Sequence, residues 1–453
     1  MARVLRGARY AETDVDQRLV RYIVHELPYL DFSEALEFYR SRIRRLTRNE
    51  WALLGCNDRF FLLTQILNRV DMLHPWLYDR CREVEARPDG YLDLWGREHY
   101  KGEMLDQPIP TPSGWTHFGH LEPGDWIFGA DGNPCRVIAR TDTFNDPNCF
   151  EVEFDDGATV TVSSQHRWAV ERRTKKRIPG AYKEGIDRRT YRETVLMTTA
   201  EIAALAHTPD KRLAIRVNDP LELPDAVLPI DPYVLGVWLG DGTAGHPYIT
   251  VGDQDRRALT GLIAATGTQV SIKRRPPRAT TLRLGSGIVS NRTSSDVANA
   301  LRALGVYRNK QIPPVYLRAS ASQRLALLQG LMDTDGHCDT RGTATFINTN
   351  ERLTDGFCEL AHTIGLKPRR RQHAATIKGK PYQFWQVSFQ AYRALPPFRL
   401  ARKLARCKPG ARPNPRRYIV ACRKVPSVPM RCIQVDRPDG LYLTGRSMVT
   451  THN

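Results

Sequence analysis

The chain has 453 residues, room for about three domains at roughly 150 residues each, and its 41% apolar and 26% charged composition excludes a disordered, collagen-like or membrane-embedded protein. Lysine and arginine outnumber aspartate and glutamate by 67 to 49, and the net charge of +18 favours a polyanionic partner such as nucleic acid. The chain has no transmembrane-length apolar run and no signal peptide, and its nine cysteines form no CxxC pair. We therefore expect a cytoplasmic protein without a zinc knuckle or disulfide scaffold.

Three composition regimes follow one another along the chain. Residues 1–101 are rich in aromatics, and FSEALEFYRSRI, RFFLLTQILNRV and HPWLYDRCREVEA repeat apolar residues at helical spacing. Residues 102–170 carry short alternating runs between Gly, Pro and Asp turns, which is typical of strands. Residues from about 228 to 400 show a mixed α/β pattern, and a last β-rich run, RCIQVDRPDGLYLTG, comes after them. We predict one β-module that is split by an inserted α/β module.

The chain ends in Thr451, His452 and Asn453. An asparagine amide can attack its own backbone carbonyl, form a succinimide and release the next residue of the chain. A neighbouring histidine can polarise that carbonyl or protonate the leaving amine, and a threonine hydroxyl can orient the amide. A His-Asn ending is unremarkable by itself, so this hypothesis depends on further motifs.

Such motifs occur at both ends of the split β-module. PIPTPSGWTHFGHLEPGDWIFGADG lies just after position 102, and GATVTVSSQHRWAV sets Ser163, His166 and Trp168 on one strand and turn. VPMRCIQVDRPDGLYLTGRSMVTTHN places Cys432 ahead of the terminal residues. In order, spacing and residue type these segments resemble the splicing blocks of inteins, the self-excising proteins of the all-β Hint (horseshoe) fold. The resemblance covers about 102–170 and 417–453.

The subclass resembles class 3 inteins, which carry a Trp, Cys and Thr signature. Most inteins begin with Cys or Ser, whereas the candidate start, Gly102 to Met104, offers no nucleophile. The signature residues here are Trp168, Cys432 and Thr451. A buried strand cysteine and a plain core tryptophan are the alternative interpretations of the first two.

This resemblance implies a splicing mechanism that needs no cofactor. Cys432 attacks the carbonyl of Lys101, and His166 protonates the departing nitrogen of Gly102. The acyl group passes to a Ser, Thr or Cys after Asn453, which then cyclises with help from the preceding histidine. Ser163 orients the scissile peptide. Because the sequence stops at Asn453, we expect this chain by itself to lose its first 101 residues at most.

Two segments of the inserted module share a pattern. Residues 234–242 read VLGVWLGDG and 328–336 read LQGLMDTDG, and both resemble the LAGLIDADG motif of homing endonucleases of the dodecapeptide type. Each motif predicts a helix with a small residue for close helix packing and an acidic residue before a terminating Gly. Packing the two helices would bring Asp241 and Asp335 together, where two carboxylates can hold Mg²⁺ and activate water. The alternative is that each Asp-Gly only caps a helix.

Basic and aromatic strands surround these motifs, as in SIKRRPPRATTLRL and KPRRRQHAATIKGKPYQFWQVSF. Such residues can neutralise phosphates or read base edges of a double-stranded DNA target, although any one of them can equally belong to a solvated face. Lys310 stands where this family often has a lysine near the cleavage centre. The candidate DNA contacts are Lys273, Arg274, Arg275, Arg369, Arg370, Arg371, Lys378 and Lys380.

The first 101 residues end in YLDLWGREHYK, which resembles the nucleotide-binding start of phage terminase large subunits. Splicing to a Ser or Thr would rebuild a deviant Walker A loop in which Lys101 contacts ATP phosphates. The alternative is a helical domain of another kind. In either case we expect no ATPase activity from this chain.

The combined interpretation is a multidomain precursor from a bacterial host or phage, acting as a monomer with its exteins in cis. The predicted domains are a helical terminase-like N-extein (1–101), the first part of an all-β Hint domain with a linker (102–227), an α/β LAGLIDADG endonuclease (228–404) and the second Hint part (405–453). The alternatives are a DNA-packaging component with an inert insertion and a non-catalytic basic DNA-binding protein.

Overall fold

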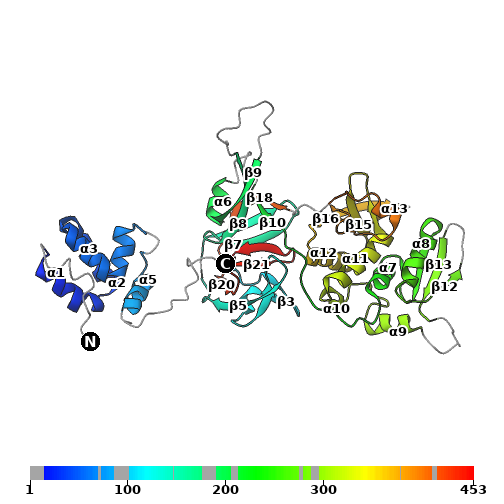
Figure 1. Ribbon diagram of the computed structural model, residues 1–453, viewed down its shortest axis with the longest axis horizontal. Helices are drawn as coiled ribbons and strands as arrows, with labels where there is room; N and C mark the ends of the chain where they lie inside the picture. The colour runs from blue at the N-terminus through cyan, green and yellow to red at the C-terminus, as the bar shows by residue number, and fades with distance from the viewer. Residues whose placement is uncertain are drawn as a thin grey trace, which may run out of the picture. The chain divides into compact units, whose positions relative to one another are not determined.

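The computed structural model forms two compact units, Met1–Leu94 and Trp95–Asn453, each considered by itself (Figure 1). The residues that the structure describes are 15–69, 73–85, 102–145, 147–175, 190–205, 213–274, 279–286, 295–377, 379–410 and 416–452. No helix within these ranges combines the length and apolar character that spanning a membrane requires.

The first unit is helical, as the apolar spacing predicts. Two of its helices begin with capping boxes, in which Asp31 and Glu34, and Thr47 and Glu50, satisfy backbone N–H groups that the first turn leaves free. Short π-helical and 3₁₀ turns extend or join the helices. The α-helices are α1 (Gln17–Arg21), α2 (Phe32–Arg42), α3 (Arg48–Asn57), α4 (Arg59–Phe61) and α5 (Pro75–Glu85).

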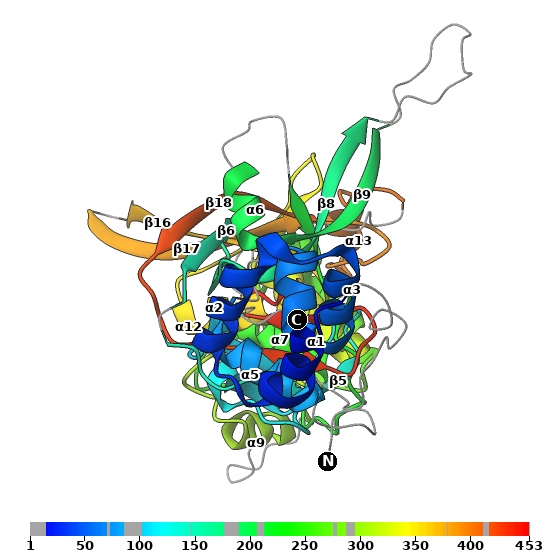
Figure 2. The ribbon, with the colours of Figure 1, turned by 90° about the vertical axis from the view of Figure 1, so that its left-hand side faces the viewer.

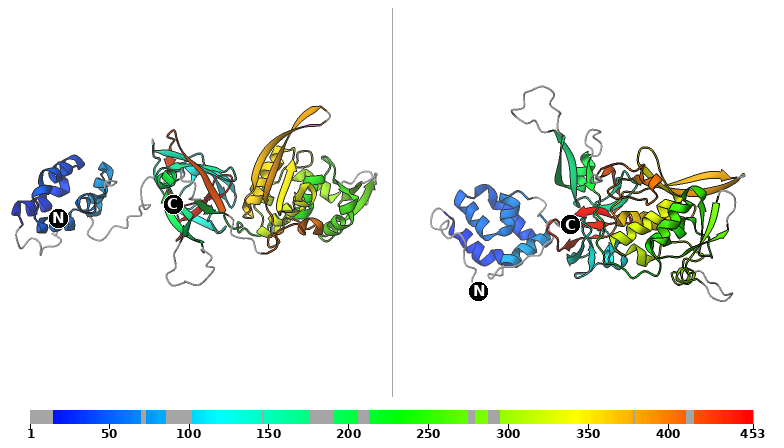
Figure 3. Two further views of the ribbon diagram at one scale, coloured as in Figure 1. Left: turned by 90° about the horizontal axis from the view of Figure 1, so that it is seen from above. Right: turned by 45° about the vertical axis from the view of Figure 1, so that its right-hand side comes forward.

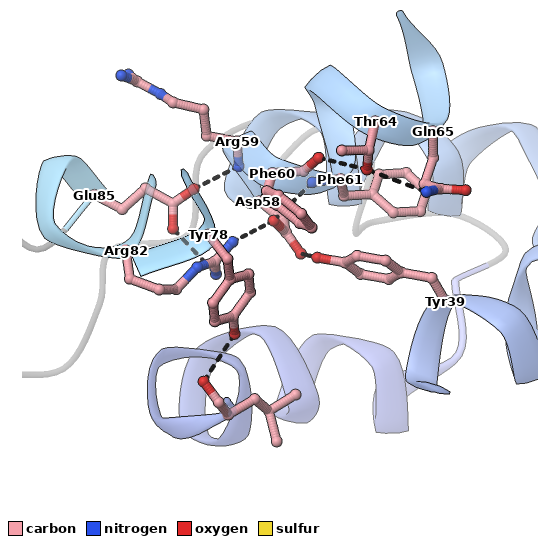
Figure 4. Close-up of polar contacts among 11 residues, drawn as sticks. Tyr39, Asp58, Arg59, Phe60, Phe61, Thr64, Gln65, Tyr78, Arg82 and Glu85 are labelled. Carbon is pink, nitrogen blue, oxygen red and sulfur yellow. Dashed lines mark hydrogen bonds and ion pairs between the residues drawn. The ribbon is translucent and has the colours of Figure 1, made fainter. Parts of the chain in front are cut away.

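A buried carboxylate ties three of these helices together (Figure 4). Asp58 is 0% exposed and accepts hydrogen bonds from the Tyr39 hydroxyl at 2.5 Å and from the Phe61 N–H at 2.9 Å. Arg82 of α5 forms an ion pair with the same carboxylate. Burial, followed by the charge of Asp58, raises the pKa of the Tyr39 hydroxyl. Loss of Arg82 would leave an uncompensated buried charge, which typically costs about 3–5 kcal/mol.

One large sheet in the second unit joins strands from both ends of the sequence. Its order is β19-β1-β7-β6-β18-β10-β8-β22-β21, and β9 pairs with β8. The early strands are β1 (Glu103–Met104), β6 (Cys149–Phe154), β7 (Thr159–Ser163), β8 (Arg167–Lys175), β9 (Thr190–Thr198) and β10 (Ala214–Arg216). The late strands are β18 (Arg416–Val425), β19 (Met430–Arg431), β21 (Leu441–Thr444) and β22 (Val449–His452). Strands from both sides of the α/β segment therefore join in one large sheet, as expected of a split β-module.

Smaller sheets complete this β-module, and α6 (Thr199–Leu205) packs beside it. A three-stranded sheet has the order β20-β5-β4, and β2 pairs with β3. The strands β8 and β9 form a hairpin that projects from the large sheet (Figure 2). The bounds are β2 (Pro108–Thr111), β3 (Gly114–His117), β4 (Trp126–Phe128), β5 (Pro134–Arg140) and β20 (Ile433–Val435).

Between β10 and β18 the chain forms an α/β segment with two sheets (Figure 3). The first half contains α7 (Pro232–Asp241), β11 (Tyr248–Gly252), α8 (Asp253–Ala264), β12 (Val270–Arg274), β13 (Ala279–Leu284), α9 (Asp296–Ala303) and α10 (Pro314–Leu317). The second half contains α11 (Ala321–Asp335), β14 (Gly336–Cys338), β15 (Thr343–Asn348), α12 (Glu351–Thr363), β16 (Arg369–Ile377), β17 (Lys380–Gln390) and α13 (Ala401–Leu404). The sheet orders are β11-β13-β12 and β14-β15-β17-β16.

Helices α7 and α11 pack against each other at two glycines. A Cβ on Gly236 would lie 2.3 Å from the Leu327 carbonyl oxygen, and one on Gly330 would lie 2.2 Å from the Tyr233 carbonyl oxygen. Because these distances leave no room for a side chain, the two backbones can approach only through glycine. This contact makes the two helices run side by side to their C-terminal ends.

The α/β segment also contacts the β-module. The Trp115 indole N–H donates to Glu359 of α12 at 2.9 Å, and Lys367 forms an ion pair with Asp155 at 2.7 Å. These polar contacts join two parts that are more than 200 residues apart in sequence, so the second unit is continuous.

Candidate functional site

The first candidate site lies where β1 meets β19 in the large sheet. Glu103 pairs with Arg431 and Met104 with Met430, so the strand that begins just after Gly102 lies beside the strand that ends just before Cys432. A Cβ on Gly102 would lie 2.7 Å from the Met430 Cβ, so this strand start fits only glycine. The predicted start of the intein therefore lies beside the strand that ends one residue before the predicted nucleophile.

Ser163 holds the backbone of Gly102 on its other side. The Gly102 N–H donates to the Ser163 Oγ at 2.9 Å, and the Ser163 N–H donates to the Gly102 carbonyl oxygen at 2.9 Å. The expectation that Ser163 orients the scissile peptide agrees with these two bonds. Lys101, the other half of that peptide, lies outside the described residues.

Cys432 is almost fully buried between β19 and β20. Its N–H donates to the Thr141 Oγ1 at 3.0 Å, and its thiol donates to the Ile433 carbonyl oxygen at 3.6 Å. The side chain is 9% exposed. Its neighbour Tyr442 is buried beside both Cys432 and Glu103, and burial raises the pKa of its hydroxyl. The thiol is therefore shielded from water in a site with several ionisable neighbours.

His166 and Thr451 meet at the turn between β7 and β8. Both are 0% exposed, and the His166 Nε2 is in hydrogen-bond contact with the Thr451 Oγ1. Strand β22 reaches this turn because His452 pairs with Arg167 of β8. His452 is half-buried on that strand, and Asn453 lies outside the described residues.

Trp168 packs directly against this histidine. The two rings lie 5.1 Å apart edge to face, and the indole N–H donates to the Thr199 Oγ1 at 3.0 Å. The side chain is 0% exposed within the core beside Phe154. This placement supports a role in positioning His166, and it agrees equally with a plain core residue.

Sequence reasoning missed Glu103, which is 0% exposed at the same site. Its Oε1 accepts from the Tyr442 hydroxyl at 2.8 Å and lies 3.9 Å from the His166 Nε2. Its Oε2 accepts from the Thr444 hydroxyl at 2.5 Å. Burial raises the pKa of this carboxyl to about 7, although hydrogen bonds from Thr444, Tyr442 and Thr451 oppose the shift. The available signal was a glutamate at the start of an otherwise apolar strand.

The second candidate site lies where α7 and α11 end. Both helices finish at the predicted acidic residues, Asp241 and Asp335, and a glycine comes after each. Desolvation and then the neighbouring charge of Asp335 raise the pKa of Asp241 to about 6, although its side chain is partly open to solvent. Desolvation also raises the pKa of Asp335, which accepts from the Asn348 side-chain amide at 2.8 Å. The structure thus brings the two carboxylates together.

Two lysines flank this carboxylate pair. The predicted Lys310 donates to the Gly240 carbonyl oxygen at 2.8 Å, and desolvation lowers its pKa. Lys403, which sequence reasoning missed, is 5% exposed and donates to the carbonyl oxygens of Asp333 at 2.7 Å and Gly336 at 2.5 Å. It lies 67 residues after the end of the motif that it caps, so no local pattern pointed to it.

The donors at this site fit a hard divalent cation. Within the described part of the chain no group of three or more His, Cys, Asp and Glu gathers as a metal site. Two facing carboxylates can nevertheless hold Mg²⁺, which usually keeps several of its waters. Desolvation and then the charge of Asp335 raise the pKa of Asp241, and a bound cation would oppose both effects.

The open face of the β14-β15-β17-β16 sheet carries part of the predicted DNA contacts. Arg369 pairs with Ser388 and Arg371 with Gln386, so these side chains share the face away from buried Val387. Arg370 pairs with Val387 and points to the other face.

There Arg370 forms ion pairs with Glu351 at 2.7 Å and Asp355 at 3.4 Å of α12. The placement of Arg370 therefore differs from that expected of a DNA contact. Sequence alone could not tell the three arginines apart.

The remaining predicted contacts are divided between described and undescribed positions. Lys273 and Arg274 are exposed at the end of β12, where the register shifts between Ile272 and Arg274. Arg275 and Lys378 lie outside the described residues, as does the side chain of Lys380.

Residues 322–393 match the LAGLIDADG-like domain family. The match lies within the inserted segment. The matched residues include most of α11 with Asp335, all of α12 and the open sheet face.

The chain is 35% identical over 370 residues to a protein described as the replicative DNA helicase DnaB of Mycobacterium intracellulare. This match covers 78% of the chain and 58% of the relative, so the chain spans little more than half the length of that protein. A replicative DNA helicase DnaB of Mycobacterium leprae is 41% identical over 68 residues, which are 15% of this chain and 11% of that protein.

Two solved structures are also similar. The splicing domain of the Msm DnaB1 intein, bound with zinc, is 17% identical with a TM-score of 0.24, and the match covers 78% of this chain and 99% of that one. A variant of the homing endonuclease I-DmoI, with its target DNA and magnesium, is 15% identical with a TM-score of 0.25, and covers 36% of this chain and 89% of that one. At these scores neither likeness assigns a residue or a reaction step.

The comparisons do not support every part of the sequence interpretation. The curated relatives are mycobacterial DnaB helicases, so the terminase-type N-extein and the phage source are not supported. The REHYK run that suggested a terminase lies outside the described residues. Nothing in the comparisons supports the class 3 assignment either, which stays a prediction.

Proposed function

We propose that this chain is an intein-containing precursor in which a split β-module excises residues 102–453 and the inserted LAGLIDADG-like domain cuts double-stranded DNA. The observation that supports the splicing part is the pairing of β1 with β19, which ends one residue before Cys432, together with the contact of His166 with Thr451 close to Glu103.

The first step uses Cys432 as the internal nucleophile, as in class 3 inteins. Its sulfur attacks the carbonyl carbon of Lys101, and the carbon–nitrogen bond to Gly102 breaks. His166 donates a proton to the departing nitrogen, which makes an amide a feasible leaving group. The thiol proton is released, so one proton moves from sulfur to nitrogen.

The later steps use the C-terminal strand. The acyl group passes from Cys432 to a hydroxyl or thiol on the residue after Asn453. The Asn453 amide then attacks its own carbonyl carbon and releases that residue, with His452 polarising the carbonyl. An acyl shift completes the new peptide bond between the exteins.

For the LAGLIDADG-like domain we propose site-specific cutting of both DNA strands. Asp241 and Asp335 would hold a divalent cation, which supplies Lewis-acid stabilisation of charge at the cleaved phosphate. Lys310 places a positive charge beside the same carboxylates. Arg369 and Arg371 would contact phosphates or base edges from the open sheet face.

The splicing proposal is tested by comparing the alanine variants of two buried cysteines. We expect the full chain to release residues 1–101 when hydroxylamine traps the thioester, and Cys432→Ala to abolish this release. Cys422→Ala is the matched control, because Cys422 is also buried in the large sheet at 8% exposed. Equal release from both variants would contradict the assignment of Cys432.

The endonuclease proposal is tested on a library of DNA duplexes with magnesium. We expect Asp335→Asn to lower the cutting rate by about a thousandfold, because metal catalysis is worth several kcal/mol. Asp253→Asn, an exposed position at the start of α8, is the control and should leave cutting unchanged. Cutting that survives Asp335→Asn would contradict the metal site.

A further inference from the structure

Glu103 is a buried carboxyl that the splicing steps above do not use. It comes directly after Gly102, the residue whose nitrogen must leave, and its Oε1 lies 3.9 Å from the His166 Nε2. The carboxyl is 0% exposed. A glutamate is rarely buried to this extent without a structural or functional partner.

The surroundings of Glu103 fix its orientation from several strands. Tyr442 and Thr444 of β21 donate to its two oxygens at 2.8 and 2.5 Å, and Thr451 of β22 donates as well. Cys432 lies near the same Tyr442. Among the described residues, these groups and His166 are ionisable and polar neighbours of the carboxyl.

Elementary electrostatics couples Glu103 to His166. A lone buried charge is costly, whereas a carboxylate beside an imidazolium is compensated. A nearby carboxylate favours the charged form of a histidine. A proton shared between the two groups would compensate both, and the hydrogen bonds from β21 stabilise the carboxylate form of Glu103.

We propose that Glu103 is a positioning residue for cleavage of the Lys101–Gly102 bond, because its carboxylate holds on His166 the proton that passes to the Gly102 nitrogen. The inference rests on the splicing function proposed above. As the Cys432 sulfur bonds to the Lys101 carbonyl carbon, the carbon–nitrogen bond breaks. The thiol proton replaces the one that His166 gives up, so the Glu103–His166 pair ends as it began and nothing is oxidised.

The test compares pH profiles of the full chain and Glu103→Gln. Release of residues 1–101 is monitored by intact mass in hydroxylamine between about pH 6 and about pH 8.5, the range in which histidine changes charge. We expect similar rates near pH 6 and a roughly tenfold slower release for Glu103→Gln near pH 8, where His166 without its carboxylate loses the proton. Glu103→Asp keeps a carboxylate and should restore most of the rate near pH 8.

Glu122→Gln is the matched control, because Glu122 is an exposed carboxylate that forms an ion pair with Arg140 at 2.6 Å. Its profile should match that of the unchanged chain. A Glu103→Gln profile that runs parallel to the unchanged chain, whether lower or equal, would overturn the proposal, because a merely structural role affects all pH values alike.

If Glu103→Gln does not fold, a second measurement tests the proposal instead. In Cys432→Ala, which should not cleave itself, the ¹⁵N shifts of the His166 ring are recorded through the same pH range. A ring still protonated near pH 8 supports the proposal, and a ring neutral near pH 7 overturns it.

Failure of the splicing function and failure of the Glu103 role give different results. If the unchanged chain releases nothing, or Cys432→Ala releases residues 1–101 as fast, the splicing function fails and the role of Glu103 fails with it. If release depends on Cys432 but the profiles are parallel, only the role of Glu103 fails.

Discussion

Glu103 and Asp241 are both carboxyls with a raised pKa, about 7 and about 6, but the causes differ. Glu103 is enclosed by strands, and its shift comes from burial against the pull of three hydrogen bonds. Asp241 lies at the open end of a helix pair, where the charge of Asp335 adds to desolvation. A proton can neutralise the carboxylate at the first site, whereas a divalent cation can neutralise the carboxylate pair at the second.

The two sites also differ in how they are built. The first site collects Glu103 from β1, Thr451 from β22, His166 from the turn after β7 and Cys432 from between β19 and β20, so it depends on how these strands pair. The second uses the ends of two helices that touch through Gly236 and Gly330. We therefore expect single changes to disable one site and spare the other.

The largest effect should come from Gly330→Ala, which tests this independence. The added Cβ would lie 2.2 Å from the Tyr233 carbonyl oxygen, so the helices must separate and the domain should lose about 3 kcal/mol or more. Gly261→Ala in α8 meets nothing within 4 Å and should gain about 0.5–1 kcal/mol. The unfolding midpoint and DNA cutting of both variants measure this difference.

Release of residues 1–101 should continue in Gly330→Ala below its unfolding midpoint. If this change instead stops release and spares DNA cutting, the two sites are not built as described.

The next effect is the pH dependence of DNA cutting. Asp241 must be ionised to hold a cation, and its raised pKa means that protons displace the cation below about pH 6. Cutting at fixed magnesium should fall roughly tenfold for each pH unit below that point. More magnesium should shift the midpoint to lower pH. A midpoint near pH 4, unaffected by magnesium, would argue against the strained carboxylate pair.

A smaller effect of opposite sign is expected for stability. Because the pKa of Asp241 is higher in the folded than in the unfolded chain, the folded state is favoured as pH falls through about 6 and disfavoured above it. Asp241→Asn should therefore raise the free energy of unfolding at about pH 8 by about 1 kcal/mol, a value lowered by solvent screening of the open side chain. Chemical denaturation without metal measures this gain in the free energy of unfolding. A variant that gains stability at about pH 4 but not at about pH 8 would contradict the sign that we derive.

The smallest effect concerns salt dependence of DNA binding. Arg371→Gln should lower the slope of log affinity against log salt by about one, as expected for one lost phosphate contact. Arg370→Gln should leave this slope unchanged, because Arg370 pairs with α12 on the other sheet face. Equal slopes for the two variants would show that DNA does not lie on this face.

The helices of the first unit, the split β-module and the convergence of Asp241 and Asp335 could be predicted because each depends on local periodicity or on a self-contained helix motif. The position of Cys432 beside Gly102 came from the intein resemblance and not from the residues alone. Lys403 and Glu103 could not be found, since their partners are supplied by distant segments. That Arg369 and Arg370 lie on different faces of the sheet could be seen only from the register of β16 against β17.

The most direct test of the central claim is the intact mass of the full chain, expressed with a short segment that begins with Ser after Asn453. The account predicts a joined product of residues 1–101 and the added segment, together with an excised chain of residues 102–453, and neither species in Cys432→Ala. An unchanged precursor, or the same products from Cys432→Ala, would contradict it.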